Sequence, residues 1–120
     1  MRRKPGSLVP LEIAVCEAAT TLRDAGHDEF HGYEIAKTIG DASSRRLLTA
    51  YGTLYRALGR LEKMGLLRSR WEDPEIPARE NRPGRRLYTL TALGDAALAD
   101  ARLATETATR RRVRRRLAPA

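Results

Sequence analysis

The chain has 120 residues, 42% of them hydrophobic, which is enough to bury one modest core, so we expect a small single-domain protein. Its 23 lysines and arginines outnumber 15 aspartates and glutamates, and the net charge of +8 favours a polyanionic partner, either nucleic acid or an anionic membrane surface. No apolar run approaches the roughly 20 residues of a membrane span, and the single Cys16 cannot form an internal disulfide. We therefore expect a cytoplasmic protein. We expect no membrane partner either, because no aromatic or bulky apolar face accompanies the arginines of the terminal segment.

The first two predicted helices precede residue 41. Residues 7–25 place apolar side chains at three- and four-residue spacing, with Ser7 as the expected N-cap and Gly26 at the end. The apolar positions are Leu8, Leu11, Val15, Ala19 and Leu22. The stretch HGYEIAKTIG, residues 31–40, predicts a short second helix that presents Tyr33, Ala36 and Ile39 on one side.

A third helix is predicted after the polar connection DASSRR, entered near Thr49 and ended at Gly65. At about 100° per residue, Leu58 and Leu61 each fall within about 40° of Leu54, and the three form a ridge to be buried. The opposite side carries Gly52, Thr53, Arg56, Arg60 and Lys63. One face therefore packs, and the other is basic and able to approach DNA closely. Tyr55 lies between the faces, where a phosphate contact and a purely structural role are both open.

Two strands are predicted next, LLRSRWED (residues 66–73) and RRLYTLT (residues 85–91), with Leu87 and Leu90 as candidates for burial. Between them PEIPARENRPG contains three prolines and mixed charge, which predicts a long loop of about residues 72–84. Three helices followed by a strand pair make a winged helix-turn-helix, a mostly α fold with a small β-hairpin (α+β), here assigned to residues 1–90 as a DNA-binding domain.

The last segment, residues 91–120, predicts a long helix capped by Thr91 and ending in an Arg-rich tail. An Ala-rich stripe permits close helix approach, and we interpret it, with Leu11 and Val15 of the first helix, as a dimer interface; packing against the chain's own core is the alternative. The stripe consists of Leu93, Ala97, Ala101, Ala104 and Ala108. The sequence RRRVRRR is either a salt-sensitive grip on phosphates or a solvated tail.

Three blocks, HGYEIAK, GTLYRALGRLEKMGLL and RPGRRLYTLTALG, occur in this order and together resemble the PadR family of transcriptional regulators, in its short subgroup with a single C-terminal helix. The resemblance implies a homodimeric repressor of a pseudo-palindromic operator in double-stranded DNA, often released by a small-molecule effector or a stress signal. It also implies DNA contacts at Tyr33, Gly52, Thr53, Tyr55 and Arg56, and at the wing arginines Arg82, Arg85 and Arg86. The terminal helix has no aromatic residue on which a planar ligand could stack, so no effector site is assigned.

Catalysis finds no support in the residue pattern. His27 and His31 lack partners at metal-ligand spacing, and no Ser-His-Asp set is apparent, so we expect no enzyme, no metal and no cofactor. Three alternatives to a sequence-specific regulator of this family remain: a protein that coats DNA nonspecifically, a winged helix that binds other proteins, and a MarR-like regulator. The GTLYRAL block and the single terminal helix argue against the last.

Overall fold

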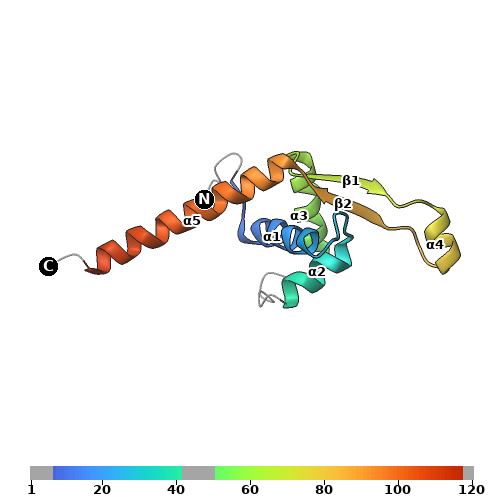
Figure 1. The fold of residues 1–120 in the computed structure, drawn as a ribbon, viewed down its shortest axis with the longest axis horizontal. Helices are drawn as coiled ribbons and strands as arrows, with labels where there is room; N and C mark the ends of the chain where they lie inside the picture. Colours follow the sequence, from blue (N-terminus) through green and yellow to red (C-terminus); the bar gives the residue numbers. More distant parts are fainter. Residues whose placement is uncertain (1–6, 42–50, 118–120) are drawn as a thin grey trace.

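The computed structural model describes residues 7–41 and 51–117. Helices α1, α2 and α3 form a compact body beside a two-stranded hairpin, from which α5 projects in one direction and the tip of the hairpin in the other (Figure 1). The long axis of the molecule measures 69 Å and the two shorter axes 30 and 26 Å. The elements in chain order are α1 (Pro10–Asp24), α2 (Gly32–Asp41), α3 (Tyr51–Lys63), β1 (Leu67–Trp71), α4 (Glu75–Glu80), β2 (Arg86–Leu90) and α5 (Ala92–Leu117).

The core lies where α1, α2 and α3 meet the hairpin. The predicted ridge of α3 is confirmed, because Leu54, Leu58 and Leu61 are fully buried. They belong to one cluster with Val15 of α1 and Ile35 of α2. The fold class predicted from the sequence, a mostly helical winged helix-turn-helix with a small antiparallel hairpin, is thereby confirmed.

The first two helices differ from the prediction in detail. Helix α1 begins at Pro10, and Val9 rather than Ser7 occupies the N-cap position. Proline suits this first turn because its missing N–H would have no helical partner, and the carboxylate of Glu12 accepts the Val9 N–H at 2.9 Å. In α2, Ile35 and Ile39 are the buried pair, spaced four residues apart, whereas Tyr33 is exposed. The predicted start of the third helix near Thr49 and the DASSRR connection lie largely outside the described residues.

The hairpin pairs β1 with β2 in antiparallel register, from Leu67 opposite Leu90 to Trp71 opposite Arg86. The expectation that Leu87 is buried was wrong: Tyr88 and Leu90 are buried, since residues two apart share a face of a strand. Phe30, just before α2, forms a bridge with Tyr88, with hydrogen bonds of 3.1 and 2.8 Å in the two directions. The start of α2 is therefore bonded to the strand that returns from the wing.

The predicted loop of residues 72–84 is not entirely a loop, because residues 75–80 form α4. Pro77 is buried in it and falls among the first residues of the helix, where the N–H groups have no helical acceptors. Glu72 closes the base of this segment: it binds Arg82 through two hydrogen bonds of 2.5 and 3.0 Å and accepts the Arg85 backbone N–H at 3.0 Å. These hydrogen bonds join the two ends of the wing segment.

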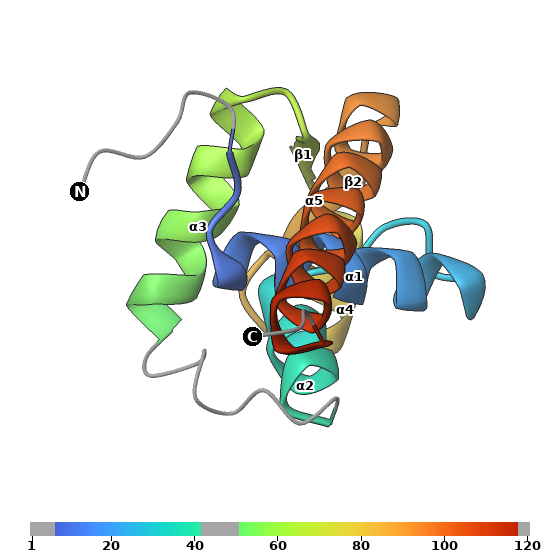
Figure 2. The same ribbon diagram turned by 90° about the vertical axis from the view of Figure 1, so that its left-hand side faces the viewer.

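Helix α5 starts as predicted, with the Thr91 hydroxyl accepting the Gly94 N–H at 3.1 Å. Gly94 is buried, and a Cβ placed on it would lie 2.4 Å from the Leu66 carbonyl oxygen, so only glycine permits this close crossing. Arg23 of α1 binds Asp95 through two hydrogen bonds of 2.9 and 3.0 Å. Beyond Ala101 every residue to Leu117 is exposed, and α5 projects from the body (Figure 1), toward the viewer in Figure 2. No helix in the described ranges is long and apolar enough to cross a membrane.

Candidate nucleic-acid interface

The exposed face of α3 follows from burial of its leucine ridge, because a helix buried on one side presents the other. Gly52, Tyr55, Arg56 and Lys63 are exposed on α3, and Thr53 is half-buried. The Arg56 guanidinium donates only to the Gly52 carbonyl oxygen, at 3.3 Å, and within the described ranges it has no carboxylate partner. The first two turns of α3 therefore expose a guanidinium, that of Arg56, which no carboxylate of the described residues neutralises.

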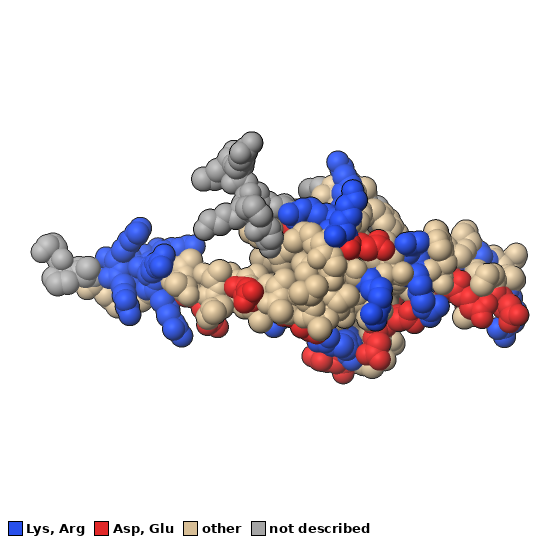
Figure 3. Space-filling view, turned by 90° about the horizontal axis from the view of Figure 1, so that it is seen from above, with Lys and Arg blue, Asp and Glu red and all other residues tan. Residues whose placement is uncertain are grey.

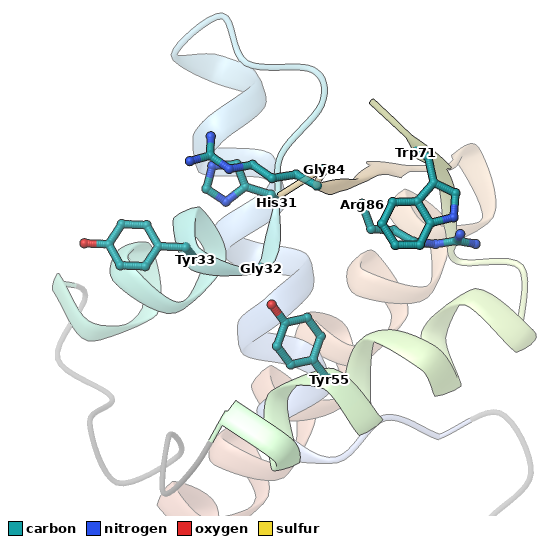
Figure 4. Close-up of a pocket in the computed structure, with 8 residues that line it drawn as sticks. His31, Gly32, Tyr33, Tyr55, Trp71, Gly84 and Arg86 are labelled. Carbon is teal, nitrogen blue, oxygen red and sulfur yellow. The ribbon is translucent and has the colours of Figure 1, made fainter. Parts of the chain in front are cut away.

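Tyr55 crosses from α3 to the start of α2. A Cβ on Gly32 would lie 2.8 Å from the Tyr55 hydroxyl oxygen, so the absence of a side chain at Gly32 lets the phenol rest there (Figure 4). Tyr33, the next residue, is 60% exposed and stacks with His31 at a centroid distance of 6.3 Å. Burial lowers the pKa of His31, while the Glu34 carboxylate, 3.2 Å from its Nε2, acts in the opposite direction. Two tyrosine hydroxyls thus border the same surface.

The hairpin supplies the opposite wall. The Arg86 guanidinium lies over the Trp71 ring at 5.3 Å, donates to the Ser69 hydroxyl at 3.0 Å and forms an ion pair with Glu62 at 3.5 Å. Arg85 is exposed, and no ion pair is recorded for it in the described part of the chain. A cavity of about 340 Å³ separates the hairpin from the helices (Figure 4). Its lining consists of His31, Gly32, Tyr33, Tyr55, Trp71, Gly84, Arg85 and Arg86.

Four of the predicted DNA-contacting residues therefore line one cavity: Tyr33, Tyr55, Arg85 and Arg86. Gly52, Thr53 and Arg56 lie on the same helix as Tyr55, and Lys63 is at its far end. Trp71 was missed by the sequence prediction, although it is 63% exposed. The sequence does show a large aromatic residue at the end of a predicted strand, on the face opposite Arg68 and Arg70. It does not reveal which of the two strand faces is open to solvent.

Two predicted contact residues are placed elsewhere. The Arg60 Nη1 binds both carboxylate oxygens of Glu12, at 2.7 and 2.6 Å, and Glu12 is only 2% exposed. The Arg82 side chain is 19% exposed and is held by Glu72 and Glu80. Since both guanidiniums already neutralise a carboxylate, their geometry favours a structural role over the DNA contact expected from the sequence.

Charge is unevenly distributed over the molecule. Lys and Arg side chains cluster at the far end of α5, both signs of charge are interspersed over the body, and Asp and Glu side chains are numerous at the wing end (Figure 3). The exposed acids there are Asp73, Glu75 and Glu80. Phosphates are repelled from such a tip. The part of the wing suited to DNA is therefore the positively charged stretch nearer the helices, which contains Arg85 and Arg86. Arg82 lowers the pKa of Glu72 and keeps its carboxylate ionised.

The residues predicted for a dimer interface divide into two sets. Val15 is 0% exposed and Leu11 is buried in the core of this protomer, so neither is available to a partner, contrary to the prediction. The α5 stripe is different. Ala97, Ala101 and Ala104 line a groove of about 380 Å³ with Leu8 and Ile13. Leu93 and Ala108 are exposed on the same helix.

Neither the cysteine thiol nor the potential metal ligands form a second site in the described part of the chain. Cys16 is fully buried, and burial raises the pKa of its thiol to about 11, so it remains protonated and unreactive at neutral pH. In the part of the chain that the structure describes, no cluster of histidine, cysteine or acidic residues could hold a metal ion.

Comparison with known proteins decides the family. Residues 22–100 match the model of the transcriptional regulator PadR-like family. The chain belongs to this family. PadR-like proteins are DNA-binding transcription regulators and not enzymes, as expected from the sequence. No curated protein matches the sequence.

Solved structures of PadR-like regulators share the fold. A regulator from Clostridium difficile R20291 has a TM-score of 0.64 and 24% identity, covering 88% of this chain and 95% of that one. One from Eggerthella lenta DSM 2243 has a TM-score of 0.64 and 22% identity, covering 88% and 82%. One from Bacillus cereus ATCC 14579 has a TM-score of 0.63 and 16% identity, covering 91% and 93%. At these identities the likeness extends to the fold alone.

Proposed function

We propose that this PadR-like chain is a homodimeric, sequence-specific repressor that binds a pseudo-palindromic operator. The observation that carries the proposal is the division among its arginines. Arg56, on the exposed face of α3, and Arg85, on the hairpin wall of the cavity, face solvent without a carboxylate partner in the described ranges, while Arg60 and Arg82 are held by glutamates. The free pair lies where a winged helix meets DNA, with the third helix in the major groove and the wing beside it.

Each residue has a role that follows from its chemistry. Arg56 donates two hydrogen bonds to guanine O6 and N7, the pairing suited to a planar guanidinium. Gly52 has no side chain and Thr53 a short one, so the start of α3 can approach base edges closely. The hydroxyls of Tyr33 and Tyr55 bind backbone phosphates, as do Lys63 and the wing residue Arg85. Arg86 divides its guanidinium between a phosphate and Glu62, with which it forms an ion pair at 3.5 Å. Phosphate contacts fix the register, and base contacts supply the specificity.

Dimerisation follows from α5. A second copy of the chain covers the groove between Leu8, Ile13 and the alanines of α5, which is open in one protomer and lined mostly by apolar side chains, with Ser7, Asp100 and Thr105 among them. A two-fold interface uses the same patch on both protomers, and α5, about 39 Å long by its 26 residues, is long enough to extend across such an interface. In this arrangement residues 1–90 read DNA, and residues 91–120 set the distance between the two reading heads.

The test is selection of bound duplexes from a random library by the purified protein at about 0.15 M salt, where screening limits nonspecific attraction. We expect an inverted repeat with half-sites roughly one helical turn apart. Arg56→Ala should relax the preference at one base position per half-site, at a loss of about 1 to 3 kcal/mol of discrimination.

Arg79→Ala is the matched control for this selection, because Arg79 is an exposed arginine on the acidic wing tip. It should leave the selected sequence unchanged. Retention of duplexes without enrichment of any sequence would replace the repressor with a protein that coats DNA nonspecifically. An unchanged preference in Arg56→Ala would remove Arg56 from the reading surface.

A further inference from the structure

The far end of α5 carries a concentration of charge that neither the core nor the cavity beside α3 uses. Six of the seven residues from 110 to 116 are arginines, and all of them are exposed in a continuous helix that runs to Leu117. None of the ion pairs in the described part of the chain involves these six. On the face seen in Figure 3, basic side chains cluster at this end of the helix.

The spacing of this charge matches a nucleic-acid backbone. Seven helical residues rise about 10 Å, so six guanidiniums give about one positive charge per 1.8 Å of helix axis. Duplex DNA carries one negative charge per about 1.7 Å of its own axis. Because successive side chains turn by about 100°, arginines project on every side of the helix, and some face a duplex whatever side it approaches from.

The helix also carries a cost that a polyanion would relieve. Arg110 and Arg114, Arg111 and Arg115, and Arg112 and Arg116 are four residues apart and repel each other on neighbouring turns. The negative C-terminal end of the helix dipole offsets part of this repulsion. Neutralisation by phosphates would remove the remainder, so the tail gains helix stability as it binds.

A membrane surface fits this segment less well. Its apolar side chains are Val113 and Leu117, and the side of the helix on which they lie continues into Thr109 and Arg110. An interfacial helix needs a wide apolar face, commonly with aromatic residues. The tail has charge without such a face, which is the composition of a phosphate-binding segment.

We propose that residues 110–116 form a second duplex-binding element, which holds backbone phosphates without reading bases and lies apart from the α3 and hairpin surface. The inference rests on the proposed DNA-binding function and adds to it a contact remote from the reading helix. Along its 69 Å length the molecule matches about 20 base pairs at roughly 3.4 Å each.

The test compares three full-length proteins: the native chain, a variant with all six tail arginines changed to Gln, and one with all six changed to Lys. Gln and Lys are both good helix formers, and these side chains contact no core residue, so the fold should persist. A variant with only Arg110→Gln, Arg112→Gln and Arg115→Gln provides an intermediate charge. Affinity for a random-sequence duplex is measured over a series of salt concentrations.

We expect the Gln variant to bind this duplex more weakly and with a shallower salt dependence. The slope of log K against log salt should shrink by about 0.9 for each phosphate released, up to about 5 for one tail. The Lys variant should retain the native slope, and the triple variant should lie midway. A native slope and affinity in the Gln variant, or failure of the native chain to bind duplex at all, would overturn the proposal.

Two further measurements separate this inference from the proposed function. If Arg56→Ala loses sequence preference while the Gln variant keeps the native salt slope, the repressor stands and the second element is wrong. If the slope falls in the Gln variant although the native chain selects no sequence, the second element stands alone. Arginine-dependent binding to phosphatidylserine vesicles, with an unchanged DNA slope, would overturn it in favour of a membrane contact.

Discussion

At the scale of single residues, we expect arginine to have two roles in this protein, binding DNA or stabilising the fold. The presence of a carboxylate partner decides which role each arginine has. Arg56 and Arg60 are four residues apart on α3, yet only Arg60 meets a buried carboxylate, that of Glu12 on α1. The Glu12 side chain also accepts the Val9 N–H and so completes the first turn of α1. Arg60 therefore fastens the reading helix to α1.

Replacing Arg60 by Ala should lower the free energy of unfolding by about 1 to 3 kcal/mol, because it deprives a buried carboxylate of its charged partner. Urea denaturation followed by circular dichroism measures the loss. Arg56→Ala, one helical turn away and exposed, should change stability by less than about 0.5 kcal/mol.

The double variant Arg60→Ala with Glu12→Gln should recover part of this loss, since the amide carries no charge to leave uncompensated. A fully stable Arg60→Ala protein with altered operator preference would return Arg60 to the DNA-contacting set.

The glycines offer a second matched pair. At Gly94 an added Cβ would meet the Leu66 carbonyl oxygen at 2.4 Å and the Leu90 side chain at 2.5 Å, whereas at Gly59 it would meet nothing within 4 Å. Gly94→Ala should therefore destabilise the protein by about 1 to 3 kcal/mol through overpacking. Gly59→Ala, inside α3, should stabilise it by about 0.5 to 1 kcal/mol. Thermal denaturation of both variants checks the signs, and a Gly94→Ala protein as stable as the native one would contradict the close crossing of α5.

At the scale of secondary-structure elements, the wing depends on one carboxylate. Glu72 receives two hydrogen bonds from Arg82 and one from the Arg85 backbone, and the Arg82 hydrogen bonds are the largest cause of its lowered pKa. A carboxylate whose pKa is lower in the folded state stabilises the fold above its unfolded pKa of about 4.3. This contribution is lost as the pH falls through the folded pKa.

Glu72→Gln should therefore be less stable than the native protein at pH 7, and the difference should shrink as the pH falls below about 5. Urea titrations between neutral and acidic pH measure it, and subtraction of the two curves removes the contributions of Asp95 and Glu29, whose pKa values are lowered by Arg23 and Arg70. A difference that stays constant with pH would show that the contribution of Glu72 to stability does not depend on its charge.

Much of the element order was predictable from the sequence, because amphipathic spacing and turn residues are local signals. The leucine ridge of α3 and the Thr91 cap are examples. The pairings of Arg60 with Glu12 and of Arg82 with Glu72 were not predictable, since a charged side chain carries no mark of its partner. The helix α4 was missed because prolines usually signal a loop, and their tolerance in a first turn depends on where the helix begins.

At the scale of the whole molecule, α5 is too long for the body that it leaves. All sixteen residues from 102 to 117 are exposed in the protomer. The single ion pair recorded there within the described ranges joins Arg102 to Glu17, at 3.6 Å. The open groove at Ala97, Ala101 and Ala104 is where the second protomer is expected to pack.

Ala104→Arg should shift the protein from dimer to monomer, because a long charged side chain fills the groove. Ala99→Arg is the matched control, since Ala99 is exposed on the opposite side of the same helix, about 200° from Ala97. Sedimentation velocity over a range of concentrations gives the two association constants. Equal association in both variants would move the interface away from the alanine stripe.

The burial of Cys16 has a practical consequence for probing these arrangements. The chain contains one cysteine, fully buried and with a thiol pKa of about 11. A cysteine introduced at an exposed position would react with a spin label or fluorophore well before the native thiol does. The distance between the two labels of a dimer could then be followed, free and on DNA, without first removing any natural residue.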